Sequence, residues 1–159
     1  MSDSVTSAIN ALVLGMGSWA FGKERRAVLA LRRMNNVKPY FLITKWEDGS
    51  VSRLLSQNHL EFASTSFGYL GRAKPTWTIV NLLQMPVLFV TIIKSYLKRR
   101  CKIILILNLL TFVNALSPIF LLRYLGRARV SFYLGDIPTN NVANRAVAGL
   151  VNAIADHVI

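Results

Sequence analysis

Residues 103–122 read IILILNLLTFVNALSPIFLL and contain no charged side chain. As a helix, a run of this length measures about 30 Å, which matches the hydrocarbon core of a bilayer. A second uncharged run, PTWTIVNLLQMPVLFVTII, occupies residues 75–93, and the basic segment KSYLKRRCK at residues 94–102 joins the two runs. Because a short basic loop between two apolar runs is typical of a membrane hairpin, we expect residues 75–125 to form a transmembrane helical hairpin.

The composition also favours a membrane location. The 159 residues are 53% hydrophobic, and 19 Lys and Arg residues against 7 Asp and Glu residues leave a net charge of +12. A surplus of this size indicates an anionic partner. The cations gather at the ends of the apolar runs, and no nucleic-acid-binding motif is present. We therefore expect bound anionic phospholipid such as cardiolipin, and no nucleic acid. The predicted head-group ligands are Arg72, Lys74, Lys98, Arg99, Arg100, Lys102, Arg123, Arg127 and Arg129.

Four amide side chains lie inside the two apolar runs, where an amide without a partner is costly. If the turn of the hairpin is centred near residue 99, Gln84 faces Asn114, and Asn81 faces Ser117. We expect these two pairs to form a polar seam between the helices. An ion or proton path is the alternative, although neither run contains an acidic, basic or histidine side chain. Asn108 has no counterpart at its depth, and we expect it to contact another subunit.

The segments outside the hairpin predict smaller elements. Residues 5–22 carry no charge and suit a third membrane helix or a half-buried one, which leaves two or three spans. Residues 23–34 favour a basic amphipathic helix, lying on a membrane or against a protein. Residues 40–55 contain the turn signal Asp48-Gly49 and favour a β-hairpin, to which residues 129–134 add a third strand.

A C-terminal amphipathic helix is indicated by apolar residues at three- and four-residue intervals between residues 142 and 158. The expected fold class is therefore membrane α-helical, with a small extramembrane sheet. Its four expected segments are residues 1–36, 37–74, 75–125 and 126–159.

No catalytic or metal-binding constellation emerges from the sequence. The two histidines, His59 and His157, are nearly a hundred residues apart. The glycines of Gly15-Met-Gly17 lack the spacing of a dinucleotide-binding fingerprint and, in this interpretation, the preceding strand. The single cysteine, Cys101, lies among cations that could lower a thiol pKa, although an unreactive loop residue is the more ordinary reading. We expect neither an enzyme nor a small-molecule substrate.

In architecture alone, such a chain resembles the small basic hairpin proteins that serve as accessory subunits or assembly factors of mitochondrial inner-membrane complexes. The resemblance implies a structural subunit of a respiratory-chain or ATP-synthase-type complex, with other membrane subunits and anionic lipid as its partners. A membrane-anchored assembly factor that recruits a soluble partner is one alternative. A small oligomeric channel or transporter is the other.

Overall fold

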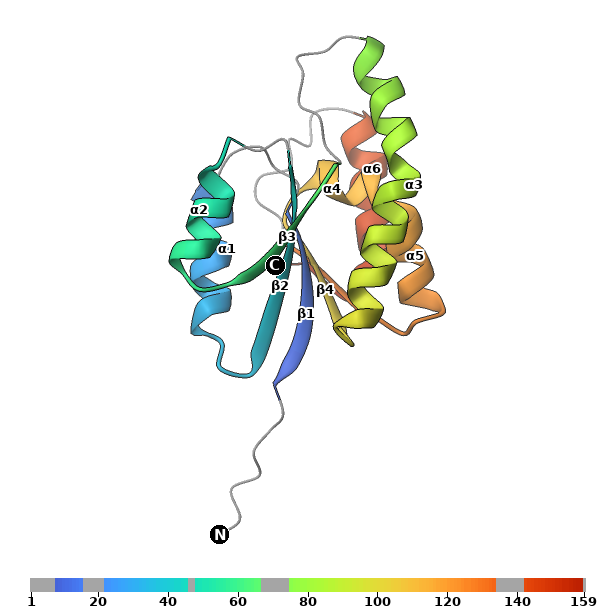
Figure 1. The fold of residues 1–159 in the computed structure, drawn as a ribbon. Helices are drawn as coiled ribbons and strands as arrows, with labels where there is room; N and C mark the ends of the chain where they lie inside the picture. Colours follow the sequence, from blue (N-terminus) through green and yellow to red (C-terminus); the bar gives the residue numbers. More distant parts are fainter. Residues whose placement is uncertain (1–7, 16–21, 46–47, 67–74, 134–141, 159) are drawn as a thin grey trace.

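A parallel β-sheet with helices on both faces forms the centre of the molecule (Figure 1). The structure, a computed structural model, describes residues 8–15, 22–45, 48–66, 75–133 and 142–158. The strands are β1 (Ile9–Gly15), β2 (Val37–Thr44), β3 (Glu61–Thr65), β4 (Ile103–Ile106), β5 (Arg129–Phe132) and β6 (His157–Val158). The helices are α1 (Gly22–Arg33), α2 (Ser50–Gln57), α3 (Pro75–Lys98), α4 (Leu109–Asn114), α5 (Leu116–Tyr124) and α6 (Val142–Ile154).

The order of the strands reverses direction once. Across the sheet the order is β3-β2-β1-β4-β5-β6, and every neighbouring pair is parallel. The chain first moves outward from β1 to β3, returns through α3 to the other side of β1, and then moves outward again. Helices α1 and α2 cover one face, and α3, α5 and α6 cover the other (Figure 1). This is a doubly wound α/β sheet with its switch point between β1 and β4.

Residues 11–14 of β1 and the strand β4 are continuously apolar because both faces of the sheet are covered there. Along β1, Leu12 and Leu14 belong to the core beneath α3 and α5, whereas Val13 belongs to the core beneath α1 and α2. Successive side chains of a strand point to opposite faces, so a two-sided core requires an unbroken apolar run. Both cores meet at β1, which pairs along its length with β2 and also with β4.

Residues 103–122 do not form one membrane helix. They contain a buried strand, β4, followed by the short helix α4 and most of α5. Asn108 separates strand from helix: its backbone is extended, and its side-chain oxygen accepts a hydrogen bond of 2.8 Å from the backbone N–H of Thr111. The apolar run arises from burial within a protein and not from contact with lipid. The expectation of a membrane α-helical hairpin is therefore wrong.

Residues 75–98 do form a helix, α3, but this helix packs on the sheet. Its buried residues Leu88, Ile92 and Tyr96 recur at four-residue spacing and join the core beneath α3 and α5. Within the described residues, no helix combines the length and apolar character that crossing a bilayer requires.

The segments before the predicted hairpin also differ from expectation. Residues 9–15, expected to be helical, form the central strand β1. The expected β-hairpin at residues 40–55 is wrong, because β2 leads into the helix α2. Gly49 has the positive φ of 84° that the turn signal predicts, but it stands at the start of α2, where Asp48 accepts a hydrogen bond from the Ser50 backbone N–H.

Three further elements lie close to where the sequence pattern places them. Helix α1 covers most of residues 23–34, and its apolar stripe (Ala27, Val28, Leu31) packs on this chain's own sheet and not on a membrane. Residues 129–132 form a strand, which pairs in parallel with β4. Helix α6 occupies residues 142–154. The single sheet thus draws strands from all four of the expected segments.

Candidate functional site at the carboxyl edge of the sheet

The carboxyl ends of β1 and β4 lie side by side where the winding of the sheet reverses. The backbone N–H of Leu107, just after β4, donates a hydrogen bond of 3.1 Å to the carbonyl of Leu14. In open α/β sheets, the loops beyond two such strands diverge to opposite faces and leave a crevice in which ligands bind. A ligand site is therefore expected at this edge of the sheet.

Buried polar side chains concentrate at this same edge. Thr44 and Thr65 are the last residues of β2 and β3, and Thr111 lies in the first turn of α4, directly after β4. Glu24 lies in the first turn of α1, which follows β1. Among the described residues, Ser131 is the one other polar side chain that is buried to this degree. With Asn108, the first four define the carboxyl-edge cluster: Glu24, Thr44, Thr65, Asn108 and Thr111.

Glu24 is the most unusual member of the cluster. It is only 5% exposed, and its Oε2 atom has no hydrogen-bond partner among the described residues. Glu24 precedes Ala27 and Val28 by three and four residues, so it extends the stripe of α1 that packs on the sheet. A buried carboxylate oxygen without a partner is costly, and a ligand that donates a hydrogen bond would satisfy it.

Asn108 contributes a hydrogen-bond donor to this cluster. Its Oδ1 atom is used by the cap of α4, and no hydrogen bond of its Nδ2 group occurs within the described part of the chain. The cluster can therefore accept hydrogen bonds at Glu24 and donate one at Asn108. Groups of this kind bind a polar, hydroxyl-bearing ligand.

The sequence-predicted head-group ligands separate into groups at the opposite, amino edge. Arg99 forms an ion pair with Glu61 (2.5 Å), and Arg123 forms one with Asp156 (2.6 Å). Lys98 is exposed at the end of α3. Arg72 and Lys74 lie outside the described residues. The structure brings the remaining four together around one cavity: Arg100, Lys102, Arg127 and Arg129.

The predicted polar seam is distributed over three helices. Gln84 lies on α3, Asn114 ends α4, and Ser117 is exposed on α5. The side chain of Asn81 lies outside the described set. Gln84 Oε1 and Asn114 Nδ2 are both buried and neither has a hydrogen-bond partner among the described residues, so no hydrogen bond joins these two atoms. The polar seam as a whole stays a prediction. The subunit contact predicted for Asn108 also stays a prediction.

The basic neighbours of Cys101 do not set the chemistry of its thiol. Burial raises the pKa of Cys101 to about 11, and the opposing effect of Arg99 is smaller. Burial likewise raises the pKa of the neighbouring Tyr96 phenol, with a lesser contribution from Cys101. Reactivity of the kind that cations can induce is therefore not a property of this thiol.

The carboxyl-edge cluster was accessible to sequence reasoning through one signal only. Gly15-Met-Gly17 follows the apolar run of residues 11–14, which is the strand that a glycine-rich ligand loop requires. Read as part of a membrane helix, that run conceals the strand. Three threonines and a glutamate in unrelated segments carry no spacing that would connect them before the sheet is known.

The fold is Rossmann-like and is shared with GT-B glycosyltransferases and UDP-sugar epimerases. No protein-family model matches the sequence, and no curated protein matches it either. Among solved structures, Alr3699/HepE of Anabaena in complex with UDP and glucose has a TM-score of 0.64 at 17% identity, covering 94% of this chain and 37% of that one.

Two epimerases are similar to the same degree. UDP-GlcNAc 2-epimerase from Neisseria meningitidis bound to UDP-GlcNAc has a TM-score of 0.63 at 14% identity, over 94% of this chain and 39% of that one. A further UDP-N-acetylglucosamine 2-epimerase has a TM-score of 0.61 at 17% identity, over 95% and 41%. The chain spans about two fifths of the length of these structures.

These matches correct what the hairpin interpretation implied about function. The expectation of a mitochondrial respiratory-chain or ATP-synthase-type subunit is wrong, as are the assembly factor and the channel, because the shared fold is that of glycosyltransferases and epimerases. The expectations of no enzyme and of no small-molecule substrate are corrected by the same comparisons, since epimerases and UDP complexes are among the matches. The expected integral membrane location is contradicted, because the described residues contain no spanning helix.

Proposed function

We propose that this chain forms one part of an enzyme that acts on a nucleotide-linked sugar, as a transferase or an epimerase. The proposal rests on the buried polar side chains of the carboxyl-edge cluster, among which Glu24 has an Oε2 atom without a hydrogen-bond partner among the described residues. The fold shared with proteins in complex with UDP and glucose, or with UDP-GlcNAc, supports the choice of ligand.

The residue types of the cluster suit a sugar. A pyranose ring presents several hydroxyl groups, each of which donates one hydrogen bond and accepts others. Glu24 accepts a bond from one hydroxyl, and the Asn108 Nδ2 group donates to a neighbouring oxygen. In a transfer reaction the Glu24 carboxylate is also the group able to take the hydroxyl proton, as that oxygen bonds to the anomeric carbon and the nucleotide departs.

The matched structures are longer than this chain, and this difference suggests where further contacts to the ligand come from. This chain spans about two fifths of each of them. Ligand sites in α/β proteins occur preferentially where two domains meet. We therefore propose that a second domain or chain closes the crevice over the carboxyl edge and contributes the remaining contacts to the nucleotide.

Saturation-transfer NMR with UDP-GlcNAc tests this proposal on the chain itself. We expect transfer to sugar protons, and a loss of affinity of about tenfold in Glu24→Gln, which keeps the shape of the side chain and removes its charge. Asn108→Asp should also weaken binding, because aspartate preserves the helix cap but lacks the amide donor.

Lys38→Gln is the matched control, because Lys38 is exposed at the start of β2, on the opposite edge of the sheet. No transfer from UDP-GlcNAc to the wild-type chain would overturn the proposed function. An equal loss of affinity in Lys38→Gln and Glu24→Gln would overturn the assignment to the carboxyl edge.

A further inference from the structure

Four cationic side chains surround one cavity at the amino edge of the sheet, opposite the carboxyl-edge cluster. The cavity measures about 570 Å³ and lies among β1, β4 and the loops that lead into β4 and β5. Its lining contains no acidic side chain, and none of its four cations forms an ion pair within the described residues. We refer to this cavity as the basic pocket, lined by Arg100, Lys102, Arg127 and Arg129.

The two loops of the basic pocket have the same local structure. Arg100 and Arg127 each follow the end of a helix and adopt left-handed backbone, with φ of 49° and 51°. A buried small residue comes next, Cys101 or Ala128. The second cation, Lys102 or Arg129, then leads into the strand, and the Arg129 backbone N–H donates to the Lys102 carbonyl at 3.0 Å. The four cations therefore lie where two adjacent strands of one sheet, β4 and β5, begin.

Left-handed backbone is unfavourable for arginine, and glycine is the usual residue at this position of a helix end. A glycine does precede Arg127, but for a different reason: a Cβ atom at Gly126 would lie 2.8 Å from the Leu122 carbonyl oxygen. Both loops thus have arginine at a position where the backbone geometry favours glycine. Strain of this kind, held in place by surrounding structure, is a mark of functional sites.

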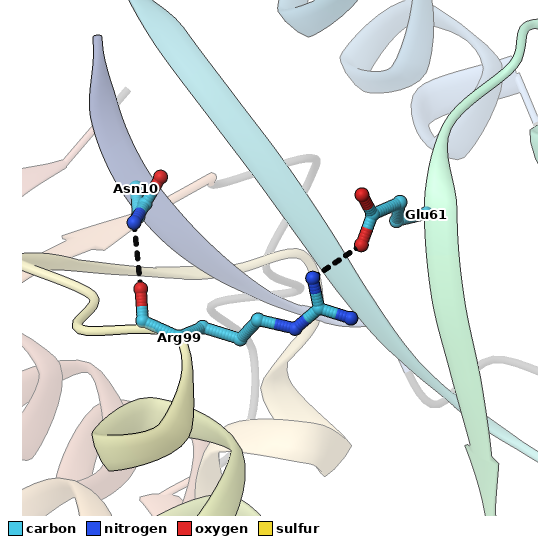
Figure 2. A network of polar contacts seen from close by, with 3 residues as sticks. All are labelled: Asn10, Glu61 and Arg99. Atoms are coloured by element: carbon cyan, nitrogen blue, oxygen red, sulfur yellow. Dashed lines mark hydrogen bonds and ion pairs between the residues drawn. The ribbon is translucent and has the colours of Figure 1, made fainter. Parts of the chain in front are cut away.

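The loop before β4 is firmly anchored, so its cations are held in position. Arg99 precedes Arg100 in the chain and contacts three strands; Figure 2 shows its contacts with Asn10 of β1 and Glu61 of β3. The Asn10 side chain donates a hydrogen bond of 2.6 Å to the Arg99 carbonyl, and the Arg99 guanidinium reaches Glu61 on β3 and lies 4.4 Å from the centre of the Tyr40 ring. These anchoring contacts all involve Arg99, so the side chains of Arg100 and Lys102 remain available to a ligand.

We propose that the basic pocket binds a phosphate-bearing anion. Three arginines present planar forks of N–H donors that match phosphate oxygens, and Lys102 adds a fourth charge; none of the four has a counterion within the described residues. An anion would relieve the mutual repulsion of four unpaired cations in a chain of net charge +12.

The phosphate could belong to a soluble compound or to a lipid head group. The helices that end at the pocket each present an exposed apolar side chain there, Leu97 at 63% and Leu125 at 77% exposure. Apolar residues beside cations are what a bilayer surface contacts, whereas a soluble phosphate needs the cations alone. Both sources share the same chemistry, and the experiment separates them.

Two probes are titrated against the folded chain: inorganic pyrophosphate by calorimetry, and vesicles of phosphatidylcholine with or without phosphatidylglycerol by cosedimentation. Binding of pyrophosphate, or of the anionic vesicles alone, supports the pocket and identifies the source of the phosphate. The affinity should fall steeply as salt is added. Failure of both probes overturns the proposal.

The site is assigned by Lys102→Gln/Arg129→Gln, which should lose about tenfold or more in affinity, compared with Arg25→Gln/Arg33→Gln on exposed positions of α1. Both variants lower the net charge by the same amount, so an equal loss in the two would show a general charge effect and overturn the pocket. If the first variant does not fold, Arg100→Gly/Arg127→Gly replaces it, because glycine accepts the same backbone geometry. Binding unchanged in that variant also overturns the pocket.

Discussion

Cys101 shows how the environment of one residue can reverse what its sequence neighbours suggest. Burial raises the pKa of this thiol from 9.0 to about 11, although cations flank it in the chain. The protonated thiol therefore stabilises the fold fully below pH 9, and this contribution is lost as the pH rises towards 11, because the unfolded thiol ionises first. We expect the free energy of unfolding to fall between pH 9 and pH 11, and to fall less in Cys101→Ala.

Urea titrations at both ends of that pH window measure the effect, and iodoacetamide labelling gives an independent check. Native Cys101 should react slowly, and the thiol of the unfolded chain should react at the rate of a free cysteine. Rapid labelling of the native protein would contradict the burial that the structure assigns to this residue.

The left-handed backbone of Arg100 and Arg127 leads to a second prediction. Arg100→Gly should stabilise the fold by about 1 kcal/mol, since glycine adopts a φ of 49° without the steric cost that arginine bears. Arg127→Gly should behave in the same way. Chemical denaturation measures both, with Arg33→Gly, in the last turn of α1, as the control expected to destabilise. A loss of stability at Arg100 would mean that its side chain contributes more to the fold than to a ligand.

The buried amide of Gln84 in α3 is either an unsatisfied polar group or part of the predicted polar seam, and a substitution separates the two. Gln84 Oε1 is buried without a hydrogen-bond partner among the described residues. Replacing an unsatisfied buried polar group by an apolar one of similar shape removes a desolvation cost, so Gln84→Met should stabilise by about 1 kcal/mol. The polar seam predicted from the sequence requires the opposite sign, because Asn114 would lose its partner. The double variant with Asn114→Leu measures any coupling between the two residues.

The misassignment of β1 and β4 has one physical cause. A strand of a parallel sheet is buried on both faces, so Ala11–Leu14 and Ile103–Ile106 are as apolar as a membrane segment of the same length. The short helix α4 follows β4 after two residues and joins the two apolar patterns into one run. Helices α1 and α6 were predictable because one side of each is polar, and α3 because it is long. The carboxyl-edge cluster depends on the order of the strands, which no local pattern contains.

For the molecule as a whole, the decisive feature is that the N-terminal strand lies at the centre. Residues 11–14 of β1 are buried, and β1 pairs with β2 on one side and β4 on the other. By contrast, β6 pairs through two residues at the rim of the sheet. Strands that are paired on both sides and buried on both faces open only with global unfolding.

Native-state hydrogen exchange therefore distinguishes this fold from a helical hairpin. We expect the slowest amides in residues 11–14, 40–43 and 104–106, which are distant in sequence and adjacent in the sheet, and we expect them to exchange together at the rate of global unfolding. The amides of β6 should exchange faster through local opening. This order should be the same with and without low concentrations of denaturant. A hairpin of residues 75–125 would instead protect one contiguous block and leave residues 11–14 to exchange freely. Protection shared between β1 and β4 thus tests the switch point on which the proposed site depends.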